Sequence, residues 1–413
     1  MKILALATIP SSQQGGMEWS TLEVCRGLFD RGHEIHLVYK ESGDFLPLYE
    51  EFCASITQTR FHEHYITHPI HSAASMIKGL LPLLRLNPDV VYIQKYQNSF
   101  FGALVARLKR VPLVCHLRAF PPRKSFNSQW SFGLNTITRC VAVSEAAKKA
   151  YVAAGFAPET IDVVYNGIDL KKFSIQDDRV QTRQQLRIAP EAFVALYAGR
   201  VDPPKNIEML LRAFAKQQRF QSNAHLLIVG GPVNFRSVET GRQYVGSLKK
   251  LCGELGISDR THFLGKRKDL PALYRAADVT VLPSLLPDTF GRTLAESMAC
   301  GTPAAGLRYG GIPEVISGEF SQFQFDVGDV DGLTRILESL RDWRTADPNL
   351  ALRCRRYAET RFAVERTVAE VERVLEDAVG LGNLRLGPSP TVLRDWGERV
   401  LSNPEAFAGH IAW

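Results

Sequence analysis

The chain has 413 residues, of which 45% are hydrophobic and 23% charged, and its formal net charge is +7. This length predicts two or three domains rather than one. The composition is typical of a globular protein, and no apolar run reaches the roughly 18 residues that span a bilayer. The seven cysteines are scattered, which predicts reduced thiols in a cytosolic protein rather than a disulfide framework.

The positive charge is unevenly distributed, since residues 1–175 carry +5 of the total of +7. A modestly basic N-terminal half is compatible with an anionic partner, either lipid headgroups or an acidic substrate. We expect no nucleic-acid partner, because no RNP-type, zinc-finger or arginine-rich motif accompanies this charge. The expected location is the cytoplasm, with peripheral contact at the inner face of the membrane as one alternative.

Short apolar runs alternate with amphipathic runs through the N-terminal half. The first apolar run, 2–8, ends before Pro10. We interpret it as a buried strand rather than a signal peptide, because no small-residue cleavage signal follows it. Helices are expected at 17–32 and 145–155. Further strands are expected at 33–39, 89–94, 111–117, 140–144 and 161–166.

Two segments of this half have competing interpretations. Residues 75–86 are apolar apart from Lys78 and Arg85, which fits either a segment that contacts a membrane surface or a core helix broken at Pro82. The core helix is favoured. Residues 62–71 contain four histidines but no cysteine or carboxylate at a fixed metal-binding spacing, so we predict no metal site there.

The same alternation restarts after a polar stretch at 169–190. Near-continuous apolar strands separated by helices are typical of parallel sheets covered on both faces. The expected strands are 193–199, 225–231, 261–265, 278–284 and 303–307. The sequence therefore predicts an α/β protein with two facing, doubly wound, Rossmann-like domains and a cleft between them, where ligands of such sheets bind.

The predicted domain boundaries follow from the polar stretch and from the change in composition near the C-terminus. The N-terminal domain covers 1–170, a linker covers 171–190, and the second domain covers 191–379. The tail at 380–413 is rich in Gly and Pro, and we assign it no role; packing against the N-terminal domain is one alternative.

Two cations follow the first strand of the second domain. Arg200 and Lys205 come after the strand 193–199 and before a helix that is expected to begin near Asn206. Cations at the carboxyl end of a strand, close to a helix N-terminus, are suited to bind a pyrophosphate. The alternative is a solvated loop with two surface cations.

Asp288 and Glu296 flank a predicted helix start. Eight residues on one helix would separate the two carboxylates by about 12 Å. A carboxylate pair that acts on one glycosidic bond is roughly 5–9.5 Å apart. The spacing therefore favours two contacts on different parts of an extended ligand, with amides near Gly291 and Thr293 available for an anion. The alternative is an N-capping Asp and an ordinary helical Glu.

The order and spacing of these segments decide between such alternatives. Together they resemble the retaining glycosyltransferases of family 4, which have the two-domain GT-B architecture, over about residues 1–379. The segments that carry this resemblance are 15–38, 142–173, 198–206, 225–231, 263–284 and 288–296.

The resemblance implies transfer of a hexosyl group from a nucleotide-sugar donor with retention of anomeric configuration. The donor would be a UDP-sugar or a GDP-sugar, and no metal or other cofactor would be required. The acceptor would be a carbohydrate, a lipid-linked molecule or a small molecule.

The resemblance also implies roles for individual residues. Glu296 would hold the donor ribose, and Asp288 would face the hydroxyls of the donor sugar. The family usually has Glu at the latter position, so Asp shortens the reach by one methylene. Arg200 and Lys205 would bind the diphosphate and stabilise the leaving group. His116, at the end of the strand 111–117, matches the family's active-site histidine.

Further donor-binding residues follow from the same resemblance. Gly15 and Gly16 match a loop near the phosphates and the acceptor. Lys266 and Arg267 belong to the segment whose backbone receives the nucleotide base. The helix start that carries the acidic motif contributes Phe290, Gly291, Arg292 and Thr293.

The mechanism implied is attack on the same face as the leaving group, with a donor phosphate oxygen accepting the proton of the acceptor. A protein nucleophile is then unnecessary. Two alternatives share the fold: a nucleotide-sugar epimerase, and a catalytically silent nucleotide-sugar-binding protein. Retention of Arg200, Lys205, Glu296 and His116 argues against the silent protein.

Overall fold

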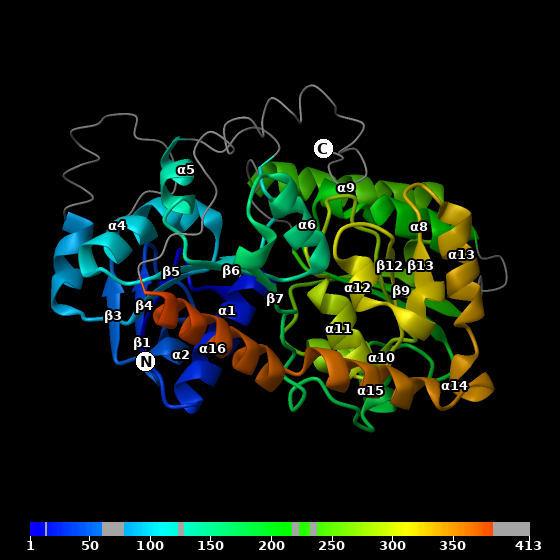
Figure 1. The fold of residues 1–413 in the computed structure, drawn as a ribbon. Coiled ribbons are helices and arrows are strands. Elements are labelled where there is room, and N and C mark those ends of the chain that lie inside the picture. Colours follow the sequence, from blue (N-terminus) through cyan, green and yellow to red (C-terminus); the bar gives the residue numbers. More distant parts are fainter. Residues whose placement is uncertain (13–14, 60–77, 123–127, 217–222, 232–237, 383–413) are drawn as a thin grey trace. The chain divides into compact units, whose positions relative to one another are not determined.

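A computed structural model describes residues 1–12, 15–59, 78–122, 128–216, 223–231 and 238–382 (Figure 1). The chain forms two compact units. The first combines Met1–Gly167 with the segment that begins at Val364, and the second covers Ile168–Ala363. Each unit contains one parallel sheet, with seven strands in the first and six in the second. The predicted α/β fold with two Rossmann-like domains is confirmed.

The sheet of the first unit has the strand order β3-β2-β1-β4-β5-β6-β7. Its strands are β1 (Lys2–Ala7), β2 (Glu34–Tyr39), β3 (Ser55–Gln58), β4 (Val90–Ile93), β5 (Leu113–Leu117), β6 (Arg139–Ala142) and β7 (Ile161–Val163). Its helices are α1 (Gly16–Asp30), α2 (Leu46–Glu50), α4 (Ser99–Lys109), α5 (Ser128–Leu134), α6 (Glu145–Ala153) and α16 (Val364–Leu381). The 3₁₀ helices are η2 (Leu81–Arg85), η3 (Tyr96–Asn98) and η4 (Pro158–Thr160).

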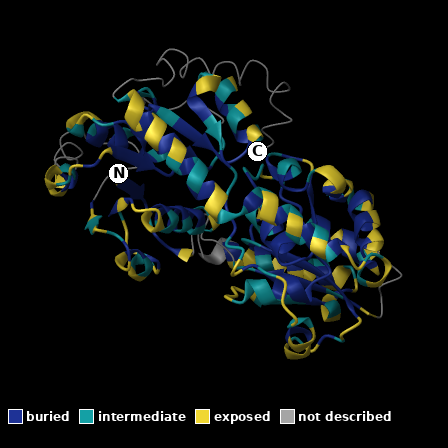
Figure 2. Ribbon diagram, turned by 60° about the horizontal axis from the view of Figure 1, so that its bottom comes forward, coloured by how far each residue is buried: buried dark blue, intermediate teal, exposed yellow. Residues whose placement is uncertain are grey.

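Successive residues of each central strand contribute to opposite faces of this sheet. In β1, Ile3 and Ala5 pack with α1 and α16, whereas Leu4 and Leu6 pack on the face covered by α4 and α6. Because both faces are covered, the strands are buried along nearly their whole length, as the dark ribbons in Figure 2 show. This explains why their sequences are apolar runs without alternation.

Helix α16 belongs to the first unit although it ends the described chain. Glu372 accepts hydrogen bonds from Arg31 Nε at 2.7 Å and contacts His33 Nε2 at 2.6 Å. Gly27 of α1 allows the two helices to approach, since a Cβ there would lie 2.4 Å from a Val368 methyl. The domain boundaries predicted from the sequence assign residues 364–379 to the second domain, but in the structure they complete the core of the first unit.

The second unit has the strand order β10-β9-β8-β11-β12-β13. Its strands are β8 (Phe193–Ala198), β9 (Ala224–Val229), β10 (Thr261–Gly265), β11 (Val279–Leu282), β12 (Ala304–Leu307) and β13 (Gln324–Phe325). Its helices are α7 (Arg179–Gln185), α8 (Ile207–Lys216), α9 (Val238–Glu254), α10 (Leu270–Ala276), α11 (Arg292–Ala299), α12 (Ile312–Val315), α13 (Val330–Ser339), α14 (Trp343–Ala346) and α15 (Leu350–Phe362). Its 3₁₀ helices are η5 (Pro203–Lys205), η7 (Ser258–Arg260) and η8 (Gly318–Phe323).

All the strands predicted from apolar runs are present, with ends shifted by a few residues, and so are both predicted helices. Two edge strands, β3 and β13, were not predicted because they are short or only partly buried. The predicted linker at 171–190 contains helix α7, which packs in the second unit. The tail at 383–413 lies outside the described residues.

The apolar segment at 75–86 is described from residue 78 onward. It contains the 3₁₀ helix η2 rather than a regular α-helix at Leu81–Arg85. Leu83 is buried in the core of the first unit, whereas Leu81 and Leu84 are 54% and 49% exposed. Residues 78–80 are helical, and Leu80 and Leu86 pack, partly buried, against the same core. The core interpretation is therefore right for Leu80, Leu83 and Leu86 but not for Leu81 and Leu84.

Candidate functional site

The strand order of the second unit reverses direction between β8 and β11, which are neighbours in the sheet. In doubly wound sheets, ligands bind at the carboxyl ends of the strands at such a switch point. The chain after β8 carries Arg200 and Lys205, and the chain after β11 carries Asp288. The predicted residues that follow these two strands therefore come from the place where the fold favours a ligand.

Lys205 and Asp288 contact each other directly. Lys205 Nζ donates to Asp288 Oδ2 at 2.8 Å, and the Gly291 amide lies 3.3 Å from Asp288 Oδ1. Burial alone would raise the pKa of Asp288, but the charge and hydrogen bond of Lys205 and the amides of Phe290 and Gly291 outweigh it and lower the pKa below its usual value. Asp288 is thus held as a carboxylate by the same lysine that is predicted to bind the diphosphate.

The main chain of Asp288 packs closely against a neighbouring loop at Gly310 and Gly311. The Asp288 carbonyl accepts a hydrogen bond from the Gly311 amide at 2.8 Å. Gly310 has φ +62°, and a Cβ at this position would lie 2.6 Å from the Asp288 carbonyl oxygen. The close approach of these two loops therefore requires glycine.

Arg200 has a buried acidic neighbour that its sequence pattern does not reveal. The Arg200 guanidinium lies 3.4 Å from an oxygen of Asp202, which is 3% exposed. Neither carboxylate oxygen of Asp202 has a hydrogen-bond partner in the described part of the chain. Burial raises the pKa of Asp202, and the charges of Arg200 and Lys205 partly oppose this effect. Asp202 lies within the segment 198–206 that carries the family resemblance. No sequence pattern distinguishes it from an ordinary Asp in a turn, however.

Glu296 is fixed by two side chains. Its Oε1 accepts from Arg292 Nε at 2.7 Å and its Oε2 accepts from the Tyr274 hydroxyl at 2.9 Å. Glu296 is 6% exposed. Burial and the neighbouring Glu296 raise the pKa of Tyr274 well above its usual value, so this phenol is a permanent donor. The contact between Arg292 and Glu296 can be predicted from their i, i+4 spacing on α11. Tyr274 lies on α10, and no local sequence pattern reveals its contact with Glu296.

The other predicted residues of the second unit have different surroundings. The side chain of Phe290 is buried in the core, with its ring 5.4 Å from that of Phe362, so only its main chain is available to a ligand. Lys266 and Arg267 follow β10, and Arg267 is held by a two-pronged contact to Asp269 at 2.8 and 2.6 Å. Gly291 has φ +86° and caps α11, whose first turn contains Arg292 and Thr293.

The first unit has its own switch point, between β1 and β4. Gly15 follows β1 with φ +103°, and α1 begins at Gly16. His116, in β5 and 1% exposed, contacts the Tyr92 hydroxyl at 2.5 Å and Arg118 at 3.2 Å, both through Nδ1. Burial, together with the charge of Arg118, lowers the pKa of His116 well below 6.5, so the ring is neutral. Its Nε2 has no hydrogen-bond partner within the described ranges.

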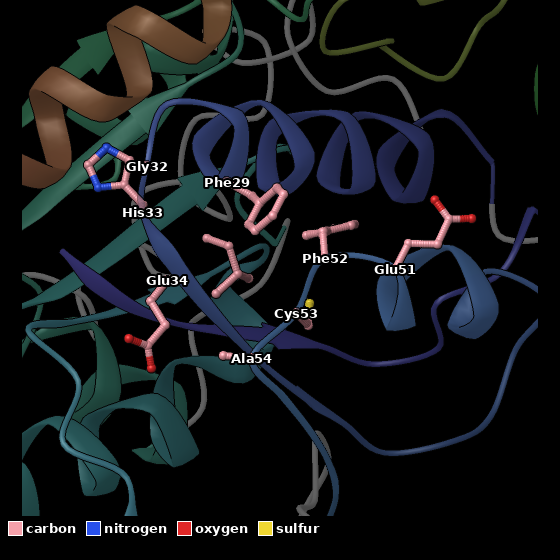
Figure 3. Close-up of a pocket in the computed structure, with 9 residues that line it drawn as sticks. Phe29, Gly32, His33, Glu34, Glu51, Phe52, Cys53 and Ala54 are labelled. Atoms are coloured by element: carbon pink, nitrogen blue, oxygen red, sulfur yellow. The ribbon is translucent and has the colours of Figure 1, made fainter.

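A shallow cavity of about 410 Å³ lies elsewhere in the first unit (Figure 3). It is lined by Phe29, Gly32, His33, Glu34, Ile35, Glu51, Phe52, Cys53 and Ala54. These residues surround the amino ends of β2 and β3. Because doubly wound sheets bind their ligands at the carboxyl ends, and because none of the predicted site residues lines this cavity, we do not assign the function to it.

Among the described residues, no group of three or more His, Cys, Asp or Glu side chains is arranged to hold a metal ion. The histidines at 62–71 lie outside those residues. No helix within the described ranges is long and apolar enough to cross a membrane.

Comparison with known protein families matches nearly the whole described chain. The family described as glycosyl transferases group 1 matches residues 178–361. The family described as glycosyltransferase family 4 matches residues 14–172. The two matches coincide approximately with the two sheets of the structure.

Several relatives are glycosyltransferases by name. The uncharacterized glycosyltransferase MJ1607 of Methanocaldococcus jannaschii is 28% identical over 324 residues, which are 74% of this chain and 80% of that protein. D-inositol 3-phosphate glycosyltransferase 1 of Catenulispora acidiphila is 27% identical over 371 residues, or 82% of this chain and 85% of the relative. The D-inositol 3-phosphate glycosyltransferase of Mycobacterium sp. strain KMS is 36% identical over 185 residues, which span only 40% of its length.

Solved structures share the two-sheet fold. The Anabaena protein Alr3699/HepE, crystallised with UDP and glucose, has a TM-score of 0.78 and 24% sequence identity, covering 91% of this chain and 100% of that one. Sucrose-phosphate synthase of Thermosynechococcus elongatus has a TM-score of 0.74 and 18% identity, covering 92% and 99%.

Proposed function

The chain belongs to the GT-B glycosyltransferases related to family 4, and we propose that it transfers a hexosyl group from a nucleotide sugar to an acceptor with retention of configuration. The observation that carries this proposal is the direct contact between Lys205 and Asp288 at the switch point of the second sheet. Arg200 follows the same strand as Lys205. Two cations beside a carboxylate provide what a nucleotide diphosphate joined to a sugar requires.

We assign the parts of the donor to residues of the second unit. Arg200 and Lys205 bind the diphosphate, Asp288 accepts hydrogen bonds from the sugar hydroxyls, and Glu296 accepts them from the ribose. Crystal complexes of the Anabaena relative with UDP and with UDP-glucose support a uridine nucleotide as the first donor to test. The main chain at Lys266 and Arg267 is the proposed neighbour of the base.

The proposed reaction breaks the bond between the anomeric carbon and the phosphate oxygen and forms a bond from the acceptor oxygen to the same face of that carbon. The acceptor proton passes to a phosphate oxygen of the leaving group. Arg200 and Lys205 stabilise the negative charge that develops on the diphosphate. We expect Gly15 and Gly16, at the start of α1, near the phosphates and the acceptor, and His116 binds the transferred sugar.

The acceptor is proposed to be a carbohydrate, a lipid-linked molecule or a small molecule. The relatives named as D-inositol 3-phosphate glycosyltransferases make a phosphorylated cyclic polyol the first small molecule to test. A nucleotide-sugar epimerase is the alternative enzyme, and it would change the donor without any acceptor.

A panel of UDP-sugars and GDP-sugars tests the proposal. One nucleotide sugar should raise the melting temperature of the protein, since a ligand that binds only the native state stabilises it. It should also be hydrolysed slowly and transferred when an acceptor is supplied. Epimerised donor without acceptor would indicate the alternative enzyme, and binding without any turnover would indicate a silent protein. Activity should survive EDTA, because two cations already serve the diphosphate; full loss that Mn²⁺ or Mg²⁺ restores would contradict this.

We also propose peripheral contact of the first unit with an anionic membrane. The exposed Leu81 and Leu84 lie beside the end of α4, where Lys109 Nζ donates to the Leu84 carbonyl at 2.7 Å and Leu108 is 49% exposed. Exposed leucines next to basic residues suit an anionic interface. The protein should sediment with anionic vesicles more than with neutral ones, and the Leu81→Ser, Leu84→Ser double variant should lose this difference. Equal sedimentation of the wild type and the double variant would refute the contact.

A further inference from the structure

Arg118 is a buried cation at the carboxyl end of β5. It is 8% exposed, and its NH1 donates to Ser20 Oγ at 2.7 Å and to Asn166 Oδ1 at 2.8 Å. A guanidinium carries five N–H donors and no acceptor. Every atom that Arg118 contacts through hydrogen bonds must therefore act as an acceptor, and this constrains the side chains around it.

The first side chain constrained in this way is His116. Arg118 NH2 lies 3.2 Å from His116 Nδ1, so Nδ1 cannot carry a proton. Tyr92 supports the same arrangement. Its hydroxyl lies 2.5 Å from Nδ1 and can donate its hydrogen to an unprotonated nitrogen there. In a neutral ring the remaining proton must then be on Nε2, which has no partner in the described part of the chain.

The second side chain is Gln94, which follows β4 and is 4% exposed. Its Oε1 lies 3.3 Å from both Arg118 Nε and Thr21 Oγ1. The amide nitrogen is therefore turned away from Arg118, and it is buried without a hydrogen-bond partner among the described residues. Because the guanidinium can only donate, the opposite orientation of this amide would set two donors against each other.

We propose that Arg118 is a positioning residue that fixes the Nε2–H tautomer of His116 and the orientation of the Gln94 amide, so that both present N–H donors to an oxygen of a bound sugar. This inference rests on the proposed function for the identity of the ligand, but not for the tautomer. His116 then serves as a hydrogen-bond donor and not as a base, because its one lone pair is occupied by Tyr92 and Arg118. The charge of Arg118 and the burial of the ring act in the same direction, since both lower the pKa of His116.

Nitrogen NMR of the imidazoles tests the tautomer directly. The protein labelled with ¹⁵N-histidine contains ten histidines, and the His116 signals are identified by their absence from the His116→Asn variant. Between pH 6 and pH 8, His116 should show an unprotonated Nδ1 and a protonated Nε2. A protonated Nδ1, or a doubly protonated ring within this range, would overturn the proposal whether or not the protein transfers sugars.

Variants of Arg118 test the cause. Arg118→Gln introduces an acceptor beside Nδ1, so part of His116 should shift to the Nδ1–H tautomer, and transfer should fall by about tenfold to a hundredfold. Arg118→Lys is the matched control, because lysine also only donates and should retain the tautomer. Tyr92→Phe should retain it as well. An unchanged tautomer in a folded Arg118→Gln variant would show that Arg118 does not determine it. If the Arg118 variants fail to fold, the wild-type spectrum still decides.

The kinetic result must be separated from failure of the proposed function. Arg118→Gln should weaken the free nucleotide diphosphate less than about twofold, because the side chains proposed to bind it, those of Arg200, Lys205 and Glu296, belong to the second unit. Loss of transfer with unchanged nucleotide affinity supports the positioning role, and equal loss of both contradicts it. A wild-type protein that shows the expected tautomer but transfers no sugar would refute the proposed function alone.

Discussion

Lys205 and Asp288 are 83 residues apart in the chain, and the ammonium group of Lys205 donates to the Asp288 carboxylate at 2.8 Å. The first residue follows β8 and the second follows β11. A residue proposed to bind phosphate and a residue proposed to bind sugar are therefore paired with each other. The pairing favours the ionised form of Asp288, and a donor that binds here must share the lysine between its diphosphate and Asp288.

The cations of the second unit can be tested by truncation. Arg200→Ala and Lys205→Ala should each lower turnover at least about tenfold, because a lost charge-assisted contact to a leaving diphosphate costs on the order of a few kcal/mol. Lys216→Ala is the matched control, since Lys216 lies at the end of α8 opposite to Lys205 and pairs with the exposed Asp331 at 2.7 Å. Initial rates at saturating donor measure the effect, and near-normal turnover of both site variants would remove these cations from the mechanism.

Asp278 should be the most sensitive ionic position of the second unit. Its carboxylate accepts hydrogen bonds from Arg183 at 2.8 Å, Arg344 at 2.9 Å and the Val194 amide at 2.8 Å, and it is 3% exposed. Asp278→Ala would leave buried guanidinium groups without a counter-charge, so we expect a loss of about 3–5 kcal/mol in the free energy of unfolding.

Urea unfolding of the second unit provides the measurement for this prediction. Asp331→Ala is the control, because its exposed pair with Lys216 should contribute at most about 1 kcal/mol. Similar losses of unfolding free energy in Asp278→Ala and Asp331→Ala would show that the buried cluster stabilises the protein no more than an exposed ion pair does.

The same cluster shows what the sequence could not predict. Strands such as Phe193–Ala198 follow directly from apolar runs, and the residues just after them locate the site, because the carboxyl ends of parallel strands are a property of the fold. Helix α7 lies in a polar segment, and its Arg183 is fully buried because Asp278, 95 residues away, provides a counter-charge and several main-chain carbonyls accept its other N–H groups. No local pattern contains that information.

The candidate site divides in the same way. Arg200, Lys205, Asp288 and Glu296 were predicted from spacing and from resemblance to a family. The partners that orient two of these residues and His116, namely Asp202, Tyr274, Tyr92 and Arg118, were missed because their roles depend on contacts between different elements. The position of α16 was missed for the same reason, since the amphipathic pattern of a helix does not identify the sheet that it covers.

The buried His116 should make the first unit sensitive to acid. Its pKa in the folded protein lies well below 6.5, so the unfolded chain binds more protons than the native one when the pH falls below about 6.5. The contribution is fully present above about pH 6.5 and is lost as the pH falls toward the folded pKa, at up to about 1.4 kcal/mol per pH unit. Urea midpoints at pH 7.5, 6.5 and 5.5 should therefore decline less steeply in His116→Gln than in the wild type. His225 and His262 also have lowered pKa values, but they are common to both proteins and cancel in the comparison. Parallel declines would contradict the assignment.

Substitutions of the two acidic residues of the motif, Asp288 and Glu296, should affect the binding of different parts of the donor. Glu296→Gln should weaken the free nucleotide diphosphate as well as the whole donor, because both contain ribose. Hydrogen bonds to a charged group contribute on the order of 1.5–3 kcal/mol, and the neutral amide should lose much of that. Arg292 and Tyr274 donate to Glu296, so they fix the carboxylate while its remaining lone pairs stay available.

Asp288→Asn should leave the affinity for the free nucleotide nearly unchanged while it reduces transfer and alters the preference among donor sugars. Lys205 also responds to this change, because the amide weakens its pairing with residue 288 and frees the lysine for the diphosphate. Any change in nucleotide affinity should therefore be a gain, which is opposite in sign to the effect of Glu296→Gln. Asp288→Glu retains the charge and should preserve transfer better than Asn does. Calorimetry with the nucleotide diphosphate decides the matter, since a loss of equal size in Glu296→Gln and Asp288→Asn would mean that both carboxylates address the same part of the donor.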